Sequence, residues 1–531
     1  MTEVVEQASR RRTIAVISHP DAGKSTLSEA LLLHANRITT AGAVHGKGGR
    51  AATVTDWMEM EKARGISITS AAVQFEHAGA VINLVDTPGH SDFSEDTYRV
   101  LSAVDSAVML VDAAKGLEAQ TMKLFDVCRR RGIPIITVIN KWDRPGRDAL
   151  DLMDELRDRT GLVPQPVTWP VGLSGVFHGL LNVASGQMER YHRTPGGATI
   201  ASIDTLTPAE AEAEFGEDWT TAHDEAAIVG ADAAEASATA VTPVLFGAAV
   251  LNIGVRHLLD LIVSAAPAAV VRLDEKGAER SLDEPFSAYV FKVQSGMDPA
   301  HRDRVAFARI CSGRFERGMI VTHAQSGRPF ATRYAQQVFG QDRATLEEAW
   351  PGDIVGLVNA ASLRPGHTLY DERPVTFPAI EPFAPEHFRI ARSTEANRYK
   401  QFRRGIEQLD EEGVVQVLRS ERRGDREPIL GAVGPMQFEV VADRMEREFR
   451  VPIAWDALPY SIARVTDRAS AEVLARKREC EIVERSDGSI LALFSNEWRL
   501  LILQRENPEL MLEAPTGAGA DAAPASLPQT S

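Results

Sequence analysis

The sequence predicts an α/β P-loop domain built on a parallel sheet, followed by an all-β barrel and a small α+β (ferredoxin-like) domain. Three observations support this fold class. The first half alternates short apolar runs with helical stretches, as in parallel sheets with crossover helices. From Pro285 onward, apolar runs follow one another closely and are separated by glycines, which is typical of a barrel. From Phe388 onward, strand and helix patterns mix within a short length, which indicates an α+β domain.

Composition narrows the possible functions. The chain has 531 residues, 44% hydrophobic and 25% charged, which is the balance of a globular protein. Without a run of eighteen apolar residues, no membrane partner is expected. The net charge of −16 argues against a general nucleic-acid coat, and no DNA partner is expected. The three cysteines, Cys128, Cys311 and Cys480, form no CxxC motif, which fits a reducing, cytoplasmic location.

Polar motifs follow four of the apolar runs in the first half. The carboxyl ends of parallel strands lie along one edge of a sheet, where ligands bind. The four motifs are therefore expected to meet at one site, the last of them contributing Gly247 and Ala248. The four runs are Thr13–Ser18, Val81–Val85, Ile135–Ile139 and Pro243–Phe246.

The first motif has the spacing of a phosphate-binding loop, GxxxxGK[ST], with Ser18 at the first glycine position. Gly23 lets the backbone approach phosphate oxygens, which the amides at the helix start can bind. Lys24 can neutralise the β- and γ-phosphates, and the Ser25 hydroxyl can bind Mg²⁺. The predicted phosphate-binding residues are Ser18, His19, Pro20, Asp21, Ala22, Gly23, Lys24, Ser25 and Thr26.

The second motif, Asp86-Thr87-Pro88-Gly89-His90, also begins at a strand end. Asp86 is expected to hold Mg²⁺, through water. The amide of Gly89 can donate to the γ-phosphate, which places His90 beside that phosphate. A lone DxxG is a common turn, but its position about sixty residues after the phosphate loop favours the functional interpretation.

The third motif, Asn140-Lys141-Trp142-Asp143, selects the base. The carboxylate of Asp143 can accept from N1–H and from the 2-amino group of guanine, a donor pair that adenine lacks. Lys141 can cover the purine face with its aliphatic stem. Asn140 can either bond the base or tie the loops together. With the phosphate loop, this motif predicts GTP and GDP as ligands.

A fourth element lies between the first two motifs. The segment Arg64–Thr69 follows Gly42–Thr55, a polar stretch rich in glycine. Such a segment can be ordered by ligand, and Thr69 would give a hydroxyl to Mg²⁺ and an amide to the γ-phosphate. Loss of the γ-phosphate would release this segment, as in GTPase switches. In isolation, Thr69 fits an ordinary strand threonine.

These motifs together resemble those of translational GTPases, and longer stretches resemble the bacterial class II peptide chain release factors. Those stretches are SHPDAGKST, DWMEMEKARGISITS, FKVQSGMDPAHRDRVAFARICSGRFERGM, GAVGPMQFEVV and NEWRL. The resemblance covers about Arg11 to about Arg499. Serine at the position of Ser18 is usual in that family.

The resemblance implies a GTPase that binds the ribosome, both RNA and proteins, during translation termination. It also implies that class I release factors are partners, whose dissociation and recycling the protein promotes with GTP and Mg²⁺. His90 would orient the attacking water, with Lys24 and Thr69 as further catalytic residues and Ser25, Thr69 and Asp86 as metal ligands. No arginine finger is evident in the sequence, so we expect slow intrinsic hydrolysis that the ribosome accelerates.

The expected domains are a guanine-nucleotide domain (1–275), a barrel (285–380), an α+β domain (386–512) and a disordered tail (513–531). An acidic stretch from Pro208 to Ala240 is expected to form a peripheral helical insertion. A basic, aromatic stretch offers either an RNA contact or a solvated helix face with Phe402 in the core. That stretch contains Arg398, Tyr399, Lys400, Phe402, Arg403 and Arg404, and His301-Arg302-Asp303-Arg304 has the same two interpretations.

Three alternatives remain beside the release-factor hypothesis. The protein could be another ribosomal GTPase, such as an elongation factor or a ribosome-protection protein. It could be a P-loop kinase or ATPase, which would need an adenine pocket in place of the Asn140–Asp143 motif. It could also be a GTP-dependent binding module without ribosome-stimulated hydrolysis.

Overall fold

The computed structural model describes residues 2–38, 68–192, 199–237, 240–295, 304–339, 342–424, 427–477 and 480–515. The predicted switch stretch Gly42–Thr55, most of Arg64–Thr69, residues His301–Asp303 and the tail beyond residue 515 lie outside these ranges. The chain forms two compact units. The first contains the parallel sheet and the barrel, and the second is mainly the chain after Ala379. In the described ranges, no helix has the length and apolar character needed to cross a membrane.

The first unit is built on a sheet with the order β2-β3-β1-β4-β5-β11-β6. The β2–β3 pair is antiparallel, and the other neighbouring pairs are parallel. Every residue of β3, β4 and β5 is buried, as expected for parallel strands covered on both faces. The strands are β1 (Arg11–Ser18), β2 (Ala71–His77), β3 (Ala80–Asp86), β4 (Ser106–Asp112), β5 (Ile135–Asn140), β6 (Val163–Pro166) and β11 (Val241–Phe246).

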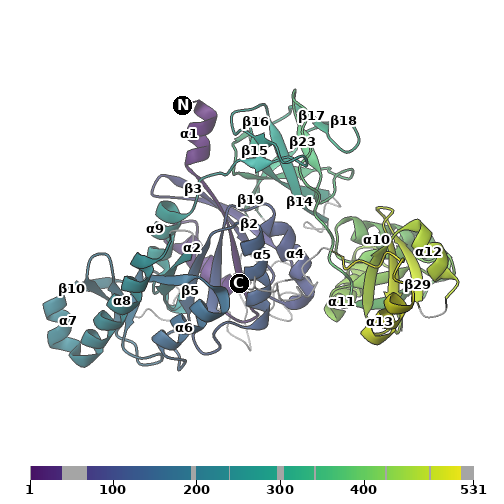
Figure 1. Cartoon of the computed structure of the whole chain (residues 1–531). Helices are drawn as coiled ribbons and strands as arrows, with labels where there is room; N and C mark the ends of the chain where they lie inside the picture. The colour runs from purple at the N-terminus through teal and green to yellow at the C-terminus, as the bar shows by residue number, and fades with distance from the viewer. Residues whose placement is uncertain are drawn as a thin grey trace, which may run out of the picture. The chain divides into compact units, whose positions relative to one another are not determined.

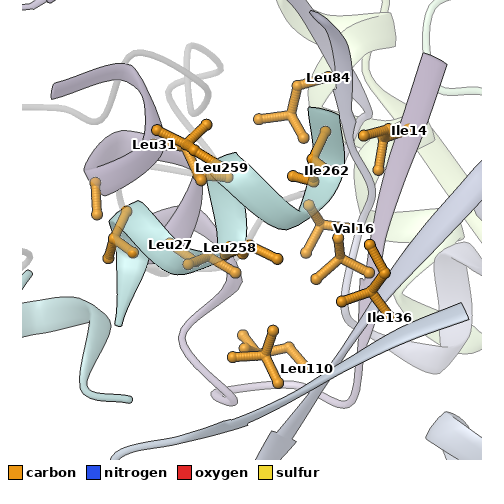
Figure 2. Packing of buried hydrophobic residues seen from close by; sticks show 14 of the residues in the cluster. Ile14, Val16, Leu27, Leu31, Leu84, Leu110, Ile136, Leu258, Leu259 and Ile262 are labelled. Atoms are coloured by element: carbon orange, nitrogen blue, oxygen red, sulfur yellow. The ribbon is translucent and has the colours of Figure 1, made fainter. Parts of the chain in front are cut away.

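Helices α2 and α9 cover one face of this sheet with leucine and isoleucine side chains (Figure 2). Leu258, Leu259 and Ile262 recur at helical spacing on α9 and pack with Leu27 and Leu31 of α2. This cluster fixes α2, whose first turn forms part of the site described below. The helices of the domain are α1 (Glu3–Ser9), α2 (Lys24–His34), α4 (Ser94–Leu101), α5 (Ala119–Arg130), α6 (Ala149–Thr160) and α9 (Val255–Ala265).

The acidic insertion is helical, as the sequence predicts. It forms α7 (Pro208–Phe215) and α8 (Glu217–Glu235), and Figure 1 shows both on the side of the parallel sheet away from the barrel. Trp219 of α8 is buried, so the insertion packs on the domain. A small antiparallel sheet adjoins it, made of β7 (Thr168–Val171), β8 (Gly179–Asn182), β9 (Gln187–Tyr191) and β10 (Ile203–Leu206).

The barrel has the strand order β18-β17-β23-β14-β15-β22-β19, with β20 beside β19. The pairs β18–β17, β17–β23, β23–β14, β15–β22 and β22–β19 are antiparallel, which confirms the predicted all-β domain. Phe339 of β19 also pairs with Val73 of β2, so the barrel and the parallel sheet share one hydrogen-bonded sheet. The strands are β14 (Ser287–Ser295), β15 (Arg304–Ser312), β17 (Ile320–His323), β18 (Arg328–Ala331), β19 (Ala335–Phe339), β20 (Asp342–Thr345), β22 (Ile354–Val358) and β23 (Thr368–Tyr370).

The second unit contains an antiparallel sheet with the order β27-β24-β26-β25-β29-β30-β28. Its first part runs strand–helix–strand–strand–helix–strand, and the four strands lie in the order fourth, first, third, second. This is the predicted ferredoxin-like pattern, extended by three strands and two helices. The elements are β24 (His387–Ser393), α10 (Tyr399–Glu411), β25 (Gln416–Arg419), β26 (Ile429–Ala432), α11 (Pro435–Arg447), β27 (Ile453–Ala457), β28 (Ile462–Thr466), α12 (Arg468–Ala475), β29 (Cys480–Arg485), β30 (Ile490–Phe494) and α13 (Glu497–Glu506).

The basic stretch on α10 has the arrangement of a solvated helix face. Phe402 is buried in the core of the unit. Arg403 pairs with Glu407 at 2.8 Å, one turn along the helix. Arg398, at the start of the helix, pairs with Glu395 at 2.7 Å. Two of its basic side chains thus lie beside carboxylates of their own segment, which weakens the RNA-contact interpretation.

The α9 core gives a stability prediction. Leu259 is fully buried, so Leu259→Ala removes packed methyl groups and leaves a cavity. We expect the free energy of unfolding of this domain to fall by about 2–5 kcal/mol. Urea unfolding followed by circular dichroism measures it. Leu501→Ala, at a largely exposed position on α13, should change stability by less than about 0.5 kcal/mol. Equal effects at both positions would contradict the packing described.

Two histidines of the barrel form a network that requires a neutral imidazole at His367. Nε2 of His323 lies 2.9 Å from Nδ1 of His367, which also accepts from the amide of Arg364 at 3.1 Å. Nδ1 of His323 lies 2.8 Å from Oγ of Ser326. Burial lowers the pKa of His367 to about 4, and the nearby His323 and Arg364 act in the same direction.

This network predicts a pH dependence of stability. The folded-state pKa of His367 is depressed below the unfolded value of about 6.5, so its contribution is complete above that pH. It is lost as the pH falls toward 4, because the unfolded chain binds the proton more readily. In urea unfolding at pH 5 and pH 7.5, the free energy of unfolding of His367→Gln should depend less on pH than that of the unaltered protein. His223→Gln, at an exposed histidine, should keep the original dependence.

Candidate functional site

The phosphate loop lies between β1 and α2, as the sequence predicts. Ser18 ends β1, and Lys24 begins α2. Gly23 is the N-cap residue of this helix, with φ of 98°, a left-handed conformation that favours glycine. A Cβ atom at Gly23 would lie 2.5 Å from Nδ2 of Asn140. The loop therefore leads directly into the first turn of α2, and backbone amides at a helix start are groups that bind phosphate.

The loop after β3 packs against the phosphate loop. Nζ of Lys24 lies 3.3 Å from Oδ1 of Asp86, and both side chains are buried. The hydroxyl of Thr87 donates to the carbonyl of Val16 on β1 at 2.6 Å. At Gly89, a Cβ atom would lie 3.4 Å from Cα of Pro20. The strand-end argument is thus confirmed for these two motifs, which lie side by side.

Asn140 ties the loops together, which is one of the two roles considered for it. Its Nδ2 donates to the carbonyl of Ala22 at 2.8 Å, and its Oδ1 accepts from the amide of Ala249 at 2.9 Å. The first contact reaches the phosphate loop, and the second reaches the loop that contains Gly247 and Ala248. All four strand-end motifs therefore meet at one edge of the sheet.

Lys141 and Trp142 occupy different surroundings. Nζ of Lys141 lies 2.8 Å from Oδ2 of Asp112 and donates to the carbonyl of Asp21. Trp142 is buried and packs edge-on against Phe246, with ring centroids 5.0 Å apart. Its side chain supports the loop from the core, although the sequence pattern includes it among the nucleotide-binding residues.

Asp143 offers a carboxylate oxygen for a ligand. Its Oδ1 is buried and has no hydrogen-bond partner in the described part of the chain. The nearest cation to Oδ2, Nε of Arg144, is 3.9 Å away. A buried carboxylate oxygen without a partner is costly, and a donor pair such as guanine N1–H and its 2-amino group would satisfy it. The residues present therefore fit a guanine base.

His90 and Thr69 lie where the sequence places them along the chain. His90 directly follows Gly89 and is half-buried. Thr69 is half-buried and lies two residues before β2, next to the buried Ser70. Ile68 is buried, and residues 64–67 of the predicted switch segment fall outside the described residues.

The oxygen donors fit Mg²⁺ held together with a nucleotide. Ser25 lies in the first turn of α2, and Asp86 lies beside Lys24 of the same turn. Within the described ranges, no group of three or more His, Cys, Asp or Glu residues could hold a metal alone. Magnesium commonly takes one or two protein oxygens and completes its shell with phosphates and water, so a sparse donor set suits it.

Two acidic residues near the site were absent from the sequence prediction. Asp112 ends β4, contacts Lys141 and accepts from the amide of Ala114 at 2.8 Å. Burial alone would raise the pKa of Asp112, but the hydrogen bonds from Lys141 and the Ala114 amide outweigh it and lower that pKa. Glu118 places Oε2 2.6 Å from Nδ1 of the buried His19. The strand-end argument could have found Asp112, because it ends the apolar run Ser106–Asp112.

Comparisons with known proteins agree along the whole length. Residues 9–268 match the family model of the elongation factor Tu GTP binding domain. Residues 285–372 match elongation factor G domain 2, and residues 377–504 match the class II release factor RF3 C-terminal domain. A crystal structure of a protein from Thermus thermophilus superposes with a TM-score of 0.68 at 25% identity, covering 86% of this chain and 68% of that one.

Curated relatives are similar over nearly the full chain. Peptide chain release factor 3 from Symbiobacterium thermophilum is 44% identical over 97% of this chain and 99% of its own length. The protein of the same name from Synechococcus elongatus is 43% identical over 97% of this chain and 95% of its own length. Three family models match the three predicted parts in the same order, and the two relatives match 97% of this chain. The chain therefore belongs to the peptide chain release factor 3 family of translational GTPases.

Proposed function

We propose that this protein is a ribosome-stimulated GTPase of translation termination that promotes dissociation and recycling of class I release factors. The observation that carries the nucleotide part is the meeting of four strand-end motifs at one sheet edge, where Oδ1 of Asp143 is buried without a hydrogen-bond partner among the described residues. The termination part rests on family membership and on relatives named as release factors. Family membership and the names of these relatives both imply the ribosome as a partner.

The proposed nucleotide contacts follow from the loop geometry. The first-turn amides of α2 and Nζ of Lys24 would bind phosphates, and the amide of Gly89 would donate to the γ-phosphate. Ser25, Thr69 and Asp86 would hold Mg²⁺, which would supply charge neutralisation at the phosphates. Asp143 would select guanine, while Asn140, Trp142, Gly247 and Ala248 would keep the base loops in place.

In this scheme, hydrolysis depends on how the site positions the attacking water and the transferring phosphoryl group. His90 would orient the attacking water, and Lys24 would stabilise charge on the transferring phosphoryl group. Because ribosomal contacts would complete the arrangement, free protein would turn over slowly. The buried carboxylate of Asp143 argues against a P-loop kinase or ATPase, because adenine presents no donor pair to it. A non-catalytic GTP-dependent module remains the outcome if ribosomes do not stimulate hydrolysis.

The direct test follows GTP hydrolysis by the purified protein with and without ribosomes carrying a bound class I release factor. The departure of a fluorescent class I factor is recorded in the same reaction. Stimulated hydrolysis together with faster departure supports the proposal. Stimulation without any effect on departure keeps the ribosomal GTPase and assigns it to another step. Absence of stimulation favours the binding module.

Asp143→Asn should shift nucleotide preference from guanine to xanthine, because the amide can donate to the 2-oxo group of xanthine. We expect GTP affinity to fall by about tenfold or more, the loss of a charge-assisted hydrogen-bond pair. Competition between fluorescent GDP and XDP measures this preference. Asp148→Asn, at the N-cap of α6, is the matched control because asparagine caps helices equally well. Unchanged GTP binding by Asp143→Asn would refute the base assignment.

His90→Ala should leave GTP affinity nearly unchanged and slow ribosome-stimulated hydrolysis by about 10²-fold or more. The physical reason is that an oriented water is needed only in the transition state. Single-turnover hydrolysis on ribosomes measures the chemical step. His192→Ala, at an exposed histidine paired with Asp204, should behave like the unaltered protein. A normal single-turnover rate for His90→Ala would remove His90 from the mechanism.

A further inference from the structure

The barrel is fastened to the parallel-sheet domain by two buried ion pairs. Nε of Arg11 lies 2.8 Å from Oδ2 of Asp353, and NH2 of Arg309 lies 2.6 Å from Oδ2 of Asp105. All four side chains are less than a tenth exposed. The hydroxyl of Thr13 also donates to the carbonyl of Gly352 at 2.7 Å. Breaking either buried pair would leave a charge uncompensated, so the barrel is held firmly in this position.

Another contact of the barrel reaches the neighbourhood of the proposed switch. Nζ of Lys292, on β14, donates to the carbonyl of Ser70 at 2.6 Å and to its hydroxyl at 2.8 Å. The same nitrogen lies 3.5 Å from Oδ2 of Asp96. The Asp96 carboxylate accepts from the amide of Ser70 at 2.8 Å. Lys292 and Asp96 therefore bind the carbonyl, hydroxyl and amide of one residue.

The surroundings make this contact strong. The side chain of Lys292 is 7% exposed, and its ammonium lies 5.9 Å from the ring centre of Phe307. Burial would raise the pKa of Asp96, but Lys292, Arg99 and the hydrogen bonds from Ser70 outweigh it and lower that pKa. Charge-assisted hydrogen bonds in such surroundings are stronger than neutral ones.

The position of Ser70 gives the contact a function. Ser70 directly follows Thr69, the residue proposed to bind Mg²⁺ and the γ-phosphate. Asp96 lies on α4, which begins shortly after His90. Lys292 thus connects the barrel to the residue after Thr69 and to the helix after His90, the two segments that are proposed to contact the γ-phosphate. GDP lacks the γ-phosphate that Thr69 would recognise, so a restraint on Ser70 acts on GTP and leaves GDP binding largely unaffected.

We propose that Lys292 is a positioning residue that couples the barrel to the nucleotide state. Its contacts hold the Ser70 backbone where Thr69 can meet Mg²⁺ and the γ-phosphate, and this raises affinity for GTP relative to GDP. By reciprocity, bound GTP tightens the contact between Lys292 and Ser70 and so stabilises the docked barrel. This inference rests on the proposed GTPase function and adds regulation of the same site.

The test measures dissociation constants for a non-hydrolysable GTP analogue and for GDP, without ribosomes and at constant Mg²⁺. Lys292→Met keeps a long apolar side chain and removes the ammonium. We expect affinity for the GTP analogue to fall by about tenfold, the typical loss of one charge-assisted hydrogen bond, while GDP affinity stays within about twofold. Arg317→Met, on an exposed barrel ion pair with Glu347, is the matched control and should change neither constant.

Two further variants cover the case in which Lys292→Met does not fold. Asp96→Asn removes the charge but keeps an acceptor for the Ser70 amide, and Ser70→Ala removes one acceptor of Lys292. Both should weaken GTP-analogue binding selectively, by less than Lys292→Met. Equal loss of GDP and GTP-analogue affinity would indicate a purely structural role, and unchanged affinities would remove the coupling; either overturns the inference.

Failure of the proposed function would give a different experimental result from failure of the Lys292 inference. An unaltered protein that binds both nucleotides but is not stimulated by ribosomes contradicts the proposed function while the Lys292 measurement remains valid. Selective loss of GTP-analogue affinity in the variants would then still support coupling between the barrel and the nucleotide.

Discussion

The carboxamide of Asn140 is the contact on which the geometry of the whole nucleotide site depends. It bonds the phosphate loop at Ala22 and the last strand-end loop at Ala249. The same side chain leaves no room for a Cβ atom at Gly23. The segments proposed to bind phosphate and to select the base are therefore tied by one side chain, although more than a hundred residues separate Ala22 from Asn140 in sequence. Both can be rigid because the strands behind them are buried on two faces.

Charge balance explains how the site stays stable around buried ionic groups. Lys24 and Asp86 lie 3.3 Å apart and offset one another in a position where a lone charge would be costly. Lys141 and Asp112 form a second such pair at 2.8 Å. A nucleotide phosphate would provide Lys24 with a different anion, and magnesium would provide Asp86 with a different cation. Nucleotide binding would therefore give Lys24 and Asp86 new partners of opposite charge, and neither buried charge would be left uncompensated.

Much of the fold and the site could be predicted from local sequence. The loops at Ser18, Asp86 and Asn140 each follow an apolar run, and the parallel-sheet rule is sufficient to bring them together. The helical insertion and the ferredoxin-like order were also visible in the pattern of apolar residues. Asp112 carried the same strand-end signal, so its omission was avoidable.

Other features have no local signal. Trp142 belongs to a polar motif, yet its burial against Phe246 depends on a strand about a hundred residues later. The contact of Glu118 with His19 and that of Lys292 with Ser70 join separate elements through single side chains. Such pairs depend on tertiary packing, which no periodicity or spacing encodes.

The main-chain pairing of Phe339 with Val73 also bears on how the chain can be divided. A fragment ending at residue 268, where the nucleotide-domain match stops, would lose β19 and expose the outer hydrogen-bonding groups of β2. Asp105 and Arg11 would lose Arg309 and Asp353 in the same cut. An unprotected edge strand templates pairing with other chains, so this fragment would be prone to self-association. A fragment that keeps the barrel with the parallel-sheet domain would preserve this strand pairing and both ion pairs.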